Sequence, residues 1–446
     1  MAFKSLIPLW LFSQLFWYQY MTPDLSINVG LRIPPDRLLF VLLSAMFVTS
    51  VRNRPRLDLI EGCMVLFTVM STVSLIVTGA DADGIRLRWL TTLFQLTYFP
   101  FSIYYVAKHG QYTIDEVKTL LKWLLAIQTY LVVSGVLEHY RIDALVWPKY
   151  ILDENIGDQW ERLRGPFMNS SFLGAALVMT FAASSVMALY VRGIRSWLLH
   201  CILLLTGICV YFTYTRTVWL GFFATLIIFV FTRTGLNRVS GRVLCAILLA
   251  FLVGAGSKFS LSSSTLFGRR QNTVEYRIAN ISLAYKVFLA HPILGLGYGR
   301  FGKELRMYEE AFTDDPETAL TSGNENTVFG LLTELGLVGF SLYAMIVFLA
   351  LRSCVRAYRN LPRSETIERA LPVVGGSMLT YFCLNSMTGD LRFHLFTHNI
   401  MFLILGVSAG MTLQRSDLPR VKIGDELQSD VESGAALAPD TEVRPT

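Results

Sequence analysis

The chain has 446 residues, of which 53% are hydrophobic and only 16% carry a charge, and its mean hydropathy is +0.47. A soluble protein uses about 25% charged residues to cover its surface. The composition therefore excludes an ordinary soluble globular protein and predicts a polytopic membrane protein. The formal net charge of +6 mixes the two sides of a membrane, so it must be divided by side before it says anything about partners.

Apolar runs of membrane-spanning length recur along the chain, and they predict an all-α fold with about twelve transmembrane helices. The run after Lys4 resembles a signal peptide but lacks a small-residue cleavage site, so we expect a retained first helix. Residues 1–413 would form one integral membrane domain, and the polar tail 414–446 would be disordered in the cytoplasm. The runs lie near residues 5–21, 36–52, 57–79, 86–107, 117–138, 169–191, 196–213, 215–232, 239–256, 326–351, 367–388 and 393–413.

Lysine and arginine are concentrated in the short connections that follow every second run. Such groups mark the cytoplasmic side, which predicts that both termini are cytoplasmic. Two long segments, about 139–168 and 257–325, then lie on the opposite side. The cytoplasmic set is Arg52, Arg54, Arg56, Lys108, Lys118, Lys122, Arg192, Arg195, Arg233, Arg238, Arg242, Arg352, Arg356, Arg359, Arg363, Arg369, Arg415, Arg420 and Lys422.

The apolar pattern is interrupted most strongly between Lys258 and Gly339. A loop of this length is usually functional or disordered, and its aromatic residues at helical spacing favour a folded cap. Within it, Arg277 and Asn280 lie on the polar stripe of an amphipathic helix that should run to Ala290. His291, which precedes a proline, should end this helix as a structural cap.

Arg216 lies at or near the start of an apolar run, with almost no loop to carry it into water. A charge at that depth costs several kcal/mol unless it faces a wet cavity or an anion, so the position predicts function. The alternative is an arginine that snorkels to the headgroups. Several outer-face arginines together suit a phosphate or pyrophosphate, because a guanidinium offers paired donors and keeps its charge. For Arg269 and Arg270, a solvated surface pair is an equal alternative.

Two carboxylates flank the point where the polar segment re-enters an apolar run. Glu325 lies at the predicted start of a helix, where the ionised form is favoured. It suits a general base or a group that orients a sugar hydroxyl, and the alternative is an ordinary stabilising charge. Glu334 lies about two turns further along the helix. It is either a functional group or the partner of an arginine.

In combination, these residues resemble the O-antigen ligase and O-antigen polymerase superfamily of bacterial inner-membrane glycosyltransferases. The long outer loop between about the ninth and tenth runs is one of five features that carry this resemblance. The other four features are sequence motifs: Gly165-Pro166-Phe167-Met168-Asn169, Thr215-Arg216-Thr217, Arg277 followed by His291-Pro292-Ile293-Leu294-Gly295-Leu296-Gly297, and Asn326 followed by Glu334-Leu335-Gly336-Leu337-Val338-Gly339.

The resemblance implies an undecaprenyl-pyrophosphate-linked saccharide donor, bound at the periplasmic face of the bacterial inner membrane. An acceptor hydroxyl would attack the anomeric carbon and the pyrophosphate would leave, in O-antigen, exopolysaccharide or capsule biosynthesis. It implies no metal, cofactor or nucleotide sugar. The implied partners are the lipid-linked donor, a saccharide or lipid-linked acceptor and membrane lipids, with no nucleic acid.

Carried over by position, Arg216 and Arg277 would act on the pyrophosphate. Glu325 would stand where the family has a loop histidine, and this departure leaves ligase and polymerase both open. The rival class is a transporter or flippase of lipid-linked saccharides, but no duplicated halves are visible in the sequence. The further candidate substrate-binding residues are Arg164, Arg269, Arg270, Arg300, Asn326 and Glu334.

Overall fold

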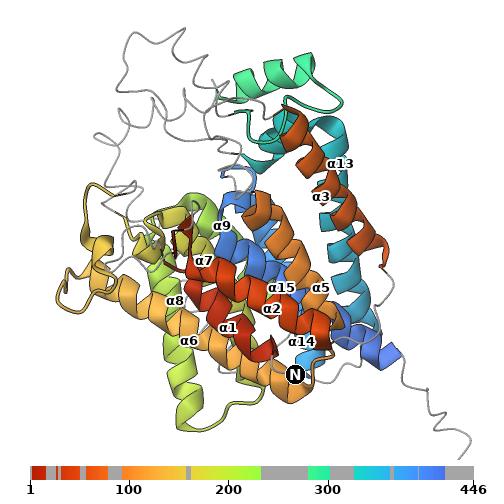
Figure 1. Cartoon of the computed structure of the whole chain (residues 1–446). Helices are drawn as coiled ribbons and strands as arrows, with labels where there is room; N and C mark the ends of the chain where they lie inside the picture. Colours follow the sequence, from red (N-terminus) through yellow and green to blue (C-terminus); the bar gives the residue numbers. More distant parts are fainter. Residues whose placement is uncertain are drawn as a thin grey trace, which may run out of the picture.

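The structure of the protein is a computed structural model. It describes residues 3–16, 27–28, 32–50, 57–78, 93–156, 162–232, 280–301, 326–361, 366–389 and 391–416. This part of the chain is a helical bundle (Figure 1). The exception is a two-residue antiparallel ladder between the first two helices, in which β1 (Ile27–Asn28) pairs with β2 (Arg32–Ile33). The predicted all-helical class is therefore confirmed apart from this short ladder.

The α-helices follow the predicted apolar runs. They are α1 (Phe3–Ser13), α2 (Pro35–Ser50), α3 (Leu59–Thr78), α5 (Phe99–His109), α6 (Ile114–His139), α7 (Ser170–Ser185), α8 (Ile194–Phe212), α9 (Arg216–Thr232), α13 (Thr327–Asn360), α14 (Ile367–Asn385) and α15 (Leu395–Ser416). The π-helical turn η2 (Phe94–Tyr98) leads into α5. The 3-10 turns are η3 (Lys149–Leu152), η4 (Gly165–Phe167), η5 (Val186–Leu189) and η7 (Leu391–Phe393). A further helix, Asn280–Ala290, lies in the polar segment.

Six of the described helices are long and apolar enough to cross a membrane. The predicted count of twelve is not confirmed, because helices such as α1 and α9 are shorter than a full span and the run 239–256 lies outside the described residues. Most of the tail also lies outside them. The six are Leu59–Thr78, Ile114–His139, Ser170–Leu189, Ile194–Phe212, Thr327–Asn360 and Leu395–Arg415.

The centre of the bundle is formed by α7 and α15, whose side chains are almost all buried. Figure 1 shows α3 and α13 side by side at one flank of this centre. Small residues allow the central helices to approach their neighbours closely, as is common where helices associate in a membrane. A Cβ at Gly406 or Gly410 of α15 would collide with the carbonyl oxygens of Tyr104 and Lys108 in α5.

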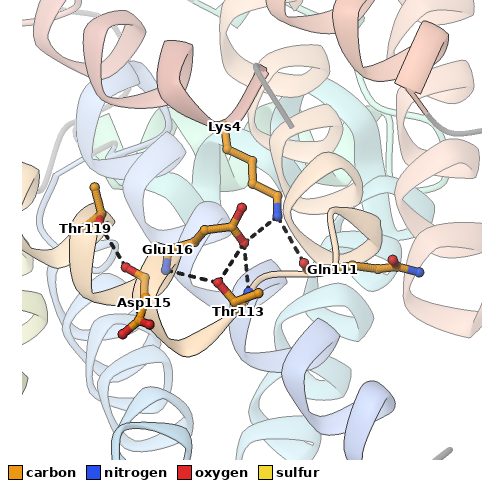
Figure 2. Close-up of polar contacts among 6 residues, drawn as sticks. All are labelled: Lys4, Gln111, Thr113, Asp115, Glu116 and Thr119. Atoms are coloured by element: carbon orange, nitrogen blue, oxygen red, sulfur yellow. Dashed lines mark hydrogen bonds and ion pairs between the residues drawn. The ribbon is translucent and has the colours of Figure 1, made fainter.

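One end of the bundle, here called the basic end, holds described members of the predicted cytoplasmic set, among them Lys108, Lys118 and Arg415. Lys4 lies at the start of α1 and contacts Glu116 and the backbone of Gln111 (Figure 2). Its Nζ donates to Glu116 Oε2 at 2.6 Å and to the carbonyl of Gln111 at 3.0 Å. Glu116 also forms a capping box with Thr113 at the start of α6. The Nζ of Lys108, at the end of α5, lies 2.6 Å from Asp58 Oδ2 beside the start of α3.

The connections at the opposite end, here called the site end, hold the words singled out in the sequence. Phe212, the last residue of α8, accepts a hydrogen bond from the amide of Leu163 at 3.3 Å. The described helices α6, α7, α8 and α9 therefore alternate in direction, as the charge pattern predicted. Which end faces the periplasm stays a prediction.

Candidate functional site

The sequence motifs that contain Asn169 and Arg216 come together where α7 and α9 begin. Asn169 caps α7, since its side-chain oxygen accepts hydrogen bonds from the amides of Ser171 at 2.9 Å and Phe172 at 3.1 Å. The hydroxyl of Ser170 then lies 3.1 Å from the hydroxyl of Thr215. Arg216 is exposed and is the first residue of α9. Its predicted position at the start of an apolar helix is confirmed.

Glycines set how closely these helices approach. A Cβ at Gly174 of α7 would overlap the side chain of Val218 in α9, and a Cβ at Gly221 of α9 would overlap Tyr381 and Asn385 in α14. The start of α9 is therefore held against both α7 and the last turn of α14.

The third helix start at this end belongs to α13. Asn326 caps it by accepting hydrogen bonds from the amides of Val328 at 2.8 Å and Phe329 at 3.3 Å. Its side-chain nitrogen donates to the carbonyl of Met387 at 2.8 Å. The amide of Thr327 donates to the carbonyl of Ser386 at 2.9 Å. Asn326 thus has a structural role as a cap, and its contact with substrate stays a prediction.

Helix α13 is broken at Gly336. Residues 291–300, here called the His-Pro loop, fill the break. Without the break, the amides of residues 337 and 338 would bond to the carbonyls four residues earlier. Here the loop backbone supplies a partner to each of these four groups. The four hydrogen bonds are Leu296 N to Thr333 O at 2.8 Å, Gly297 N to Glu334 O at 3.0 Å, Leu337 N to Pro292 O at 2.8 Å and Val338 N to Ile293 O at 3.2 Å.

Two glycines make this interlock possible. Gly295 and Gly336 have φ angles of +74° and +64°, which residues with a Cβ adopt only at a cost. A Cβ at Gly295 would also collide with the backbone of Glu334, and one at Gly336 with the backbone of Ile293. The predicted helix of the polar segment ends as expected, since the amide of His291 donates to the carbonyl of Val287 at 3.0 Å.

The interlocked loop is also fixed to α3. The amide of Tyr298 donates to the hydroxyl of Ser74 at 3.1 Å, and Gly297 lies against Thr78 with no room for a Cβ. Arg300 follows in the same loop, is half-buried, and donates its amide to the carbonyl of Gly297 at 3.2 Å. The loop thus clamps α3 to α13 at the site end.

Glu334 faces an arginine that sequence reasoning did not single out. Nη1 of Arg392, in η7, lies 3.9 Å from Oε2 of Glu334, and the two side chains are 7% and 6% exposed. The alternative that Glu334 partners an arginine is therefore confirmed. The only signal in the sequence was a set of polar residues scattered through the short connection between α14 and α15.

His394 was missed for the same reason. Its ring stacks on Phe172 of α7 at 4.5 Å between centroids and makes an edge contact with Phe167 at 4.7 Å. Its Nδ1 lies 2.9 Å from the hydroxyl of Thr397. Burial lowers the pKa of His394, which precedes the first residue of α15, to about 3. The imidazole is therefore neutral at physiological pH.

Arg164 organises the connection between α6 and α7. Its guanidinium is fully buried and donates to the carbonyls of Ile156 at 2.6 Å, Asp153 at 3.1 Å and Ile151 at 3.2 Å. The carboxylate of Glu138 accepts from the amide of Arg164 at 3.1 Å. These contacts give Arg164 a structural role, and its contact with substrate stays a prediction.

Four predicted site residues lie outside the described part of the chain: Arg269, Arg270, Arg277 and Glu325. The structure thus brings the predicted residues Arg164, Arg216, Arg300, Asn326 and Glu334 to one end of the bundle. It adds Arg392 and His394 to them.

A helical bundle with several apolar spans and a polar cluster at one end defines an integral membrane protein. Residues 200–344 match the family model described as O-antigen ligase. The match confirms the resemblance seen in the sequence and supports the O-antigen ligase and polymerase superfamily. The matched segment includes Arg216, Arg277, Glu325 and Glu334. No curated protein matches the chain.

Proposed function

We propose that the protein transfers a saccharide from undecaprenyl pyrophosphate to an acceptor hydroxyl at the periplasmic face of the inner membrane. The observation that carries this proposal is the O-antigen ligase match, which covers Arg216, Arg277 and Glu325. The match gives no support to the transporter alternative. The product would belong to O-antigen, exopolysaccharide or capsule biosynthesis.

The cationic groups suit the leaving group of this reaction. As the glycosidic bond breaks, negative charge develops on the pyrophosphate, and preorganised cations that face it lower the barrier. Arg216 and Arg277 are the proposed cations, because a guanidinium matches phosphate oxygens with paired donors. The starts of α7, α9 and α13 add partial positive charge at the same end of the bundle.

Glu325 is the proposed group that activates or orients the acceptor hydroxyl. In the sequence it immediately precedes Asn326, the cap of α13. A carboxylate there accepts the hydroxyl proton as the oxygen attacks the anomeric carbon. The proton leaves the acceptor, and the electron pair of the broken bond stays with the pyrophosphate.

The test is transfer by the purified protein in nanodiscs, supplied with undecaprenyl-pyrophosphate oligosaccharides, with and without a lipid A-core acceptor. Products are read by mass. Lengthened lipid-linked oligosaccharide without added acceptor would identify a polymerase, and product only with the core acceptor would identify a ligase. We expect Arg216→Ala and Glu325→Gln to abolish product while Arg415→Gln, at the basic end, retains it. Wild-type donor binding without product in either condition would contradict the proposal.

A further inference from the structure

The connection between α14 and α15 places a further arginine at the site end. Arg392 lies in η7 and is buried, as is the facing residue Glu334. A buried guanidinium is costly unless a nearby opposite charge compensates it. The carboxylate of Glu334 provides this charge at 3.9 Å, a distance longer than a hydrogen bond between these atoms. Glu334 therefore neutralises Arg392 without a short contact between Nη1 and Oε2.

The position of Glu334 is itself fixed by the break in α13. Its backbone carbonyl is held by Gly297, and Gly336 turns the chain two residues later. The side chain therefore leaves a rigid piece of backbone instead of a regular helix. An ionisable pair placed with this much backbone constraint, at one end of a membrane bundle, is a candidate for function by default.

The segment that carries Arg392 also contacts the helix starts of the site. Ser386 accepts a hydrogen bond from Thr327, the first residue of α13, and Met387 accepts one from the cap residue Asn326. His394 stacks on the first turn of α7. Asn385 lies against Gly221 of α9. The described residues 385–389 and 391–394 thus contact the first turns of α7, α9 and α13, which are the positive ends of these helices.

We infer that Arg392 is a further anion-binding residue of this site and that Glu334 is its positioning residue. The inference rests on the proposed function, and the anion is the pyrophosphate of the lipid-linked donor. A guanidinium, the positive ends of three helices and the exposed Arg216 lie at one end of the bundle. Pyrophosphate oxygens suit this set because each guanidinium binds them through paired donors. Glu334 keeps Arg392 compensated until the anion arrives.

The competing explanation is an ion pair that only holds α13 to η7. The double variant Glu334→Gln and Arg392→Gln separates the two, because it removes both charges and leaves neither one buried alone. Arg392→Lys keeps the charge but loses the planar fork. The matched control is Glu368→Gln with Arg415→Gln, since this ion pair joins α14 to α15 at the basic end.

The measurement is the dissociation constant of undecaprenyl pyrophosphate, without a saccharide, for nanodisc-embedded protein, together with the melting temperature. We expect the double variant to melt near the wild type but to bind the probe about tenfold more weakly or worse, because a hydrogen-bonded charge contact is lost. Arg392→Lys should fall between the two, and it provides the same test if the double variant does not fold. The control pair should bind the probe as the wild type does.

Wild-type affinity in a well-folded double variant would overturn the inference and leave Arg392 as a structural residue. The proposed function would remain supported in that case if the wild-type protein transfers saccharide. A wild-type protein that neither binds the probe nor transfers saccharide would instead overturn the proposed function, and the inference with it.

Discussion

The amide of Gly297 donates a hydrogen bond to the backbone carbonyl of Glu334 at 3.0 Å. In an unbroken helix that carbonyl would bond to the amide of Val338, which here donates to the loop residue Ile293 instead. The motif that begins at His291 and the motif that begins at Glu334 are therefore one structural unit, although they lie apart in the sequence. The loop is inserted into the hydrogen-bond ladder of α13, and this fixes where Glu334 projects.

The interlock predicts that its two glycines tolerate no side chain. Gly295→Ala and Gly336→Ala should each lower stability by about 2 kcal/mol or more, because a left-handed backbone and a close contact are both penalised. Both should also lower transfer, since Glu334 is displaced. The measurement is the melting temperature in detergent, followed by the transfer assay.

Gly62→Ala is the matched control for these variants. Gly62 lies within α3, and a Cβ there would meet nothing within 4 Å. Alanine is favoured over glycine in a helix by about 1 kcal/mol, so this variant should melt at or above the wild-type temperature. Wild-type stability in both interlock variants would mean that the loop is not inserted in α13 as described.

Arg164 is expected to act through stability. Arg164→Lys cannot reproduce the three hydrogen bonds to the carbonyls of residues 151, 153 and 156, and should cost about 2 kcal/mol or more. The KM for the donor should stay unchanged, because a loss of folded protein lowers the maximal rate and does not alter KM. A raised KM in protein of wild-type stability would instead support the predicted contact between Arg164 and substrate.

His394 predicts a loss of stability in acid. Its folded-state pKa of about 3 lies below the ordinary value of 6.5, so the unfolded chain takes up the proton first as the pH falls. Stability that is fully present above about pH 6.5 is then lost as the pH falls toward 3. Melting temperatures between pH 7.5 and 4.5 should fall less steeply for His394→Gln than for the wild type. Equal slopes would contradict this assignment.

The charge pattern predicts the orientation of the bundle. Tyr140 is exposed at the site end and Arg192 is exposed at the basic end. In a variant without native cysteines, Tyr140→Cys should react with a membrane-impermeant maleimide in intact cells. Arg192→Cys should react only after the membrane is permeabilised. The reverse pattern would place both termini outside and would remove the periplasmic site from the proposal.

Local patterns were sufficient to predict the helices. Long apolar stretches have to satisfy their own backbone in a membrane, so α3, α6, α8 and α15 follow their runs closely. The predicted count of twelve spans stays unconfirmed, because six of the described helices are long enough to cross a membrane and the run 239–256 lies outside the described residues. Among the described helices, α1 and α9 are apolar but shorter than a full span.

Residue type alone did not reveal which polar side chains are already used within the fold. Arg164 and Asn326 both looked suited to a substrate, but the structure places their donors on backbone carbonyls. Arg392 was not among the predicted site residues because it lies in a short turn, although it lies against Glu334. Such pairings depend on the packing of distant segments, and no local pattern contains them.

By itself, the sequence determined a polytopic helical membrane protein, the alternation of its ends and the words of the O-antigen ligase and polymerase superfamily. These properties follow from hydropathy, charge and residue spacing, which are local. Only the tertiary structure decided that the His-Pro loop is inserted into α13 and that Arg392 lies against Glu334. The reason is that a broken helix must find new hydrogen-bond partners, and a buried charge must find an opposite one, wherever the fold brings them together.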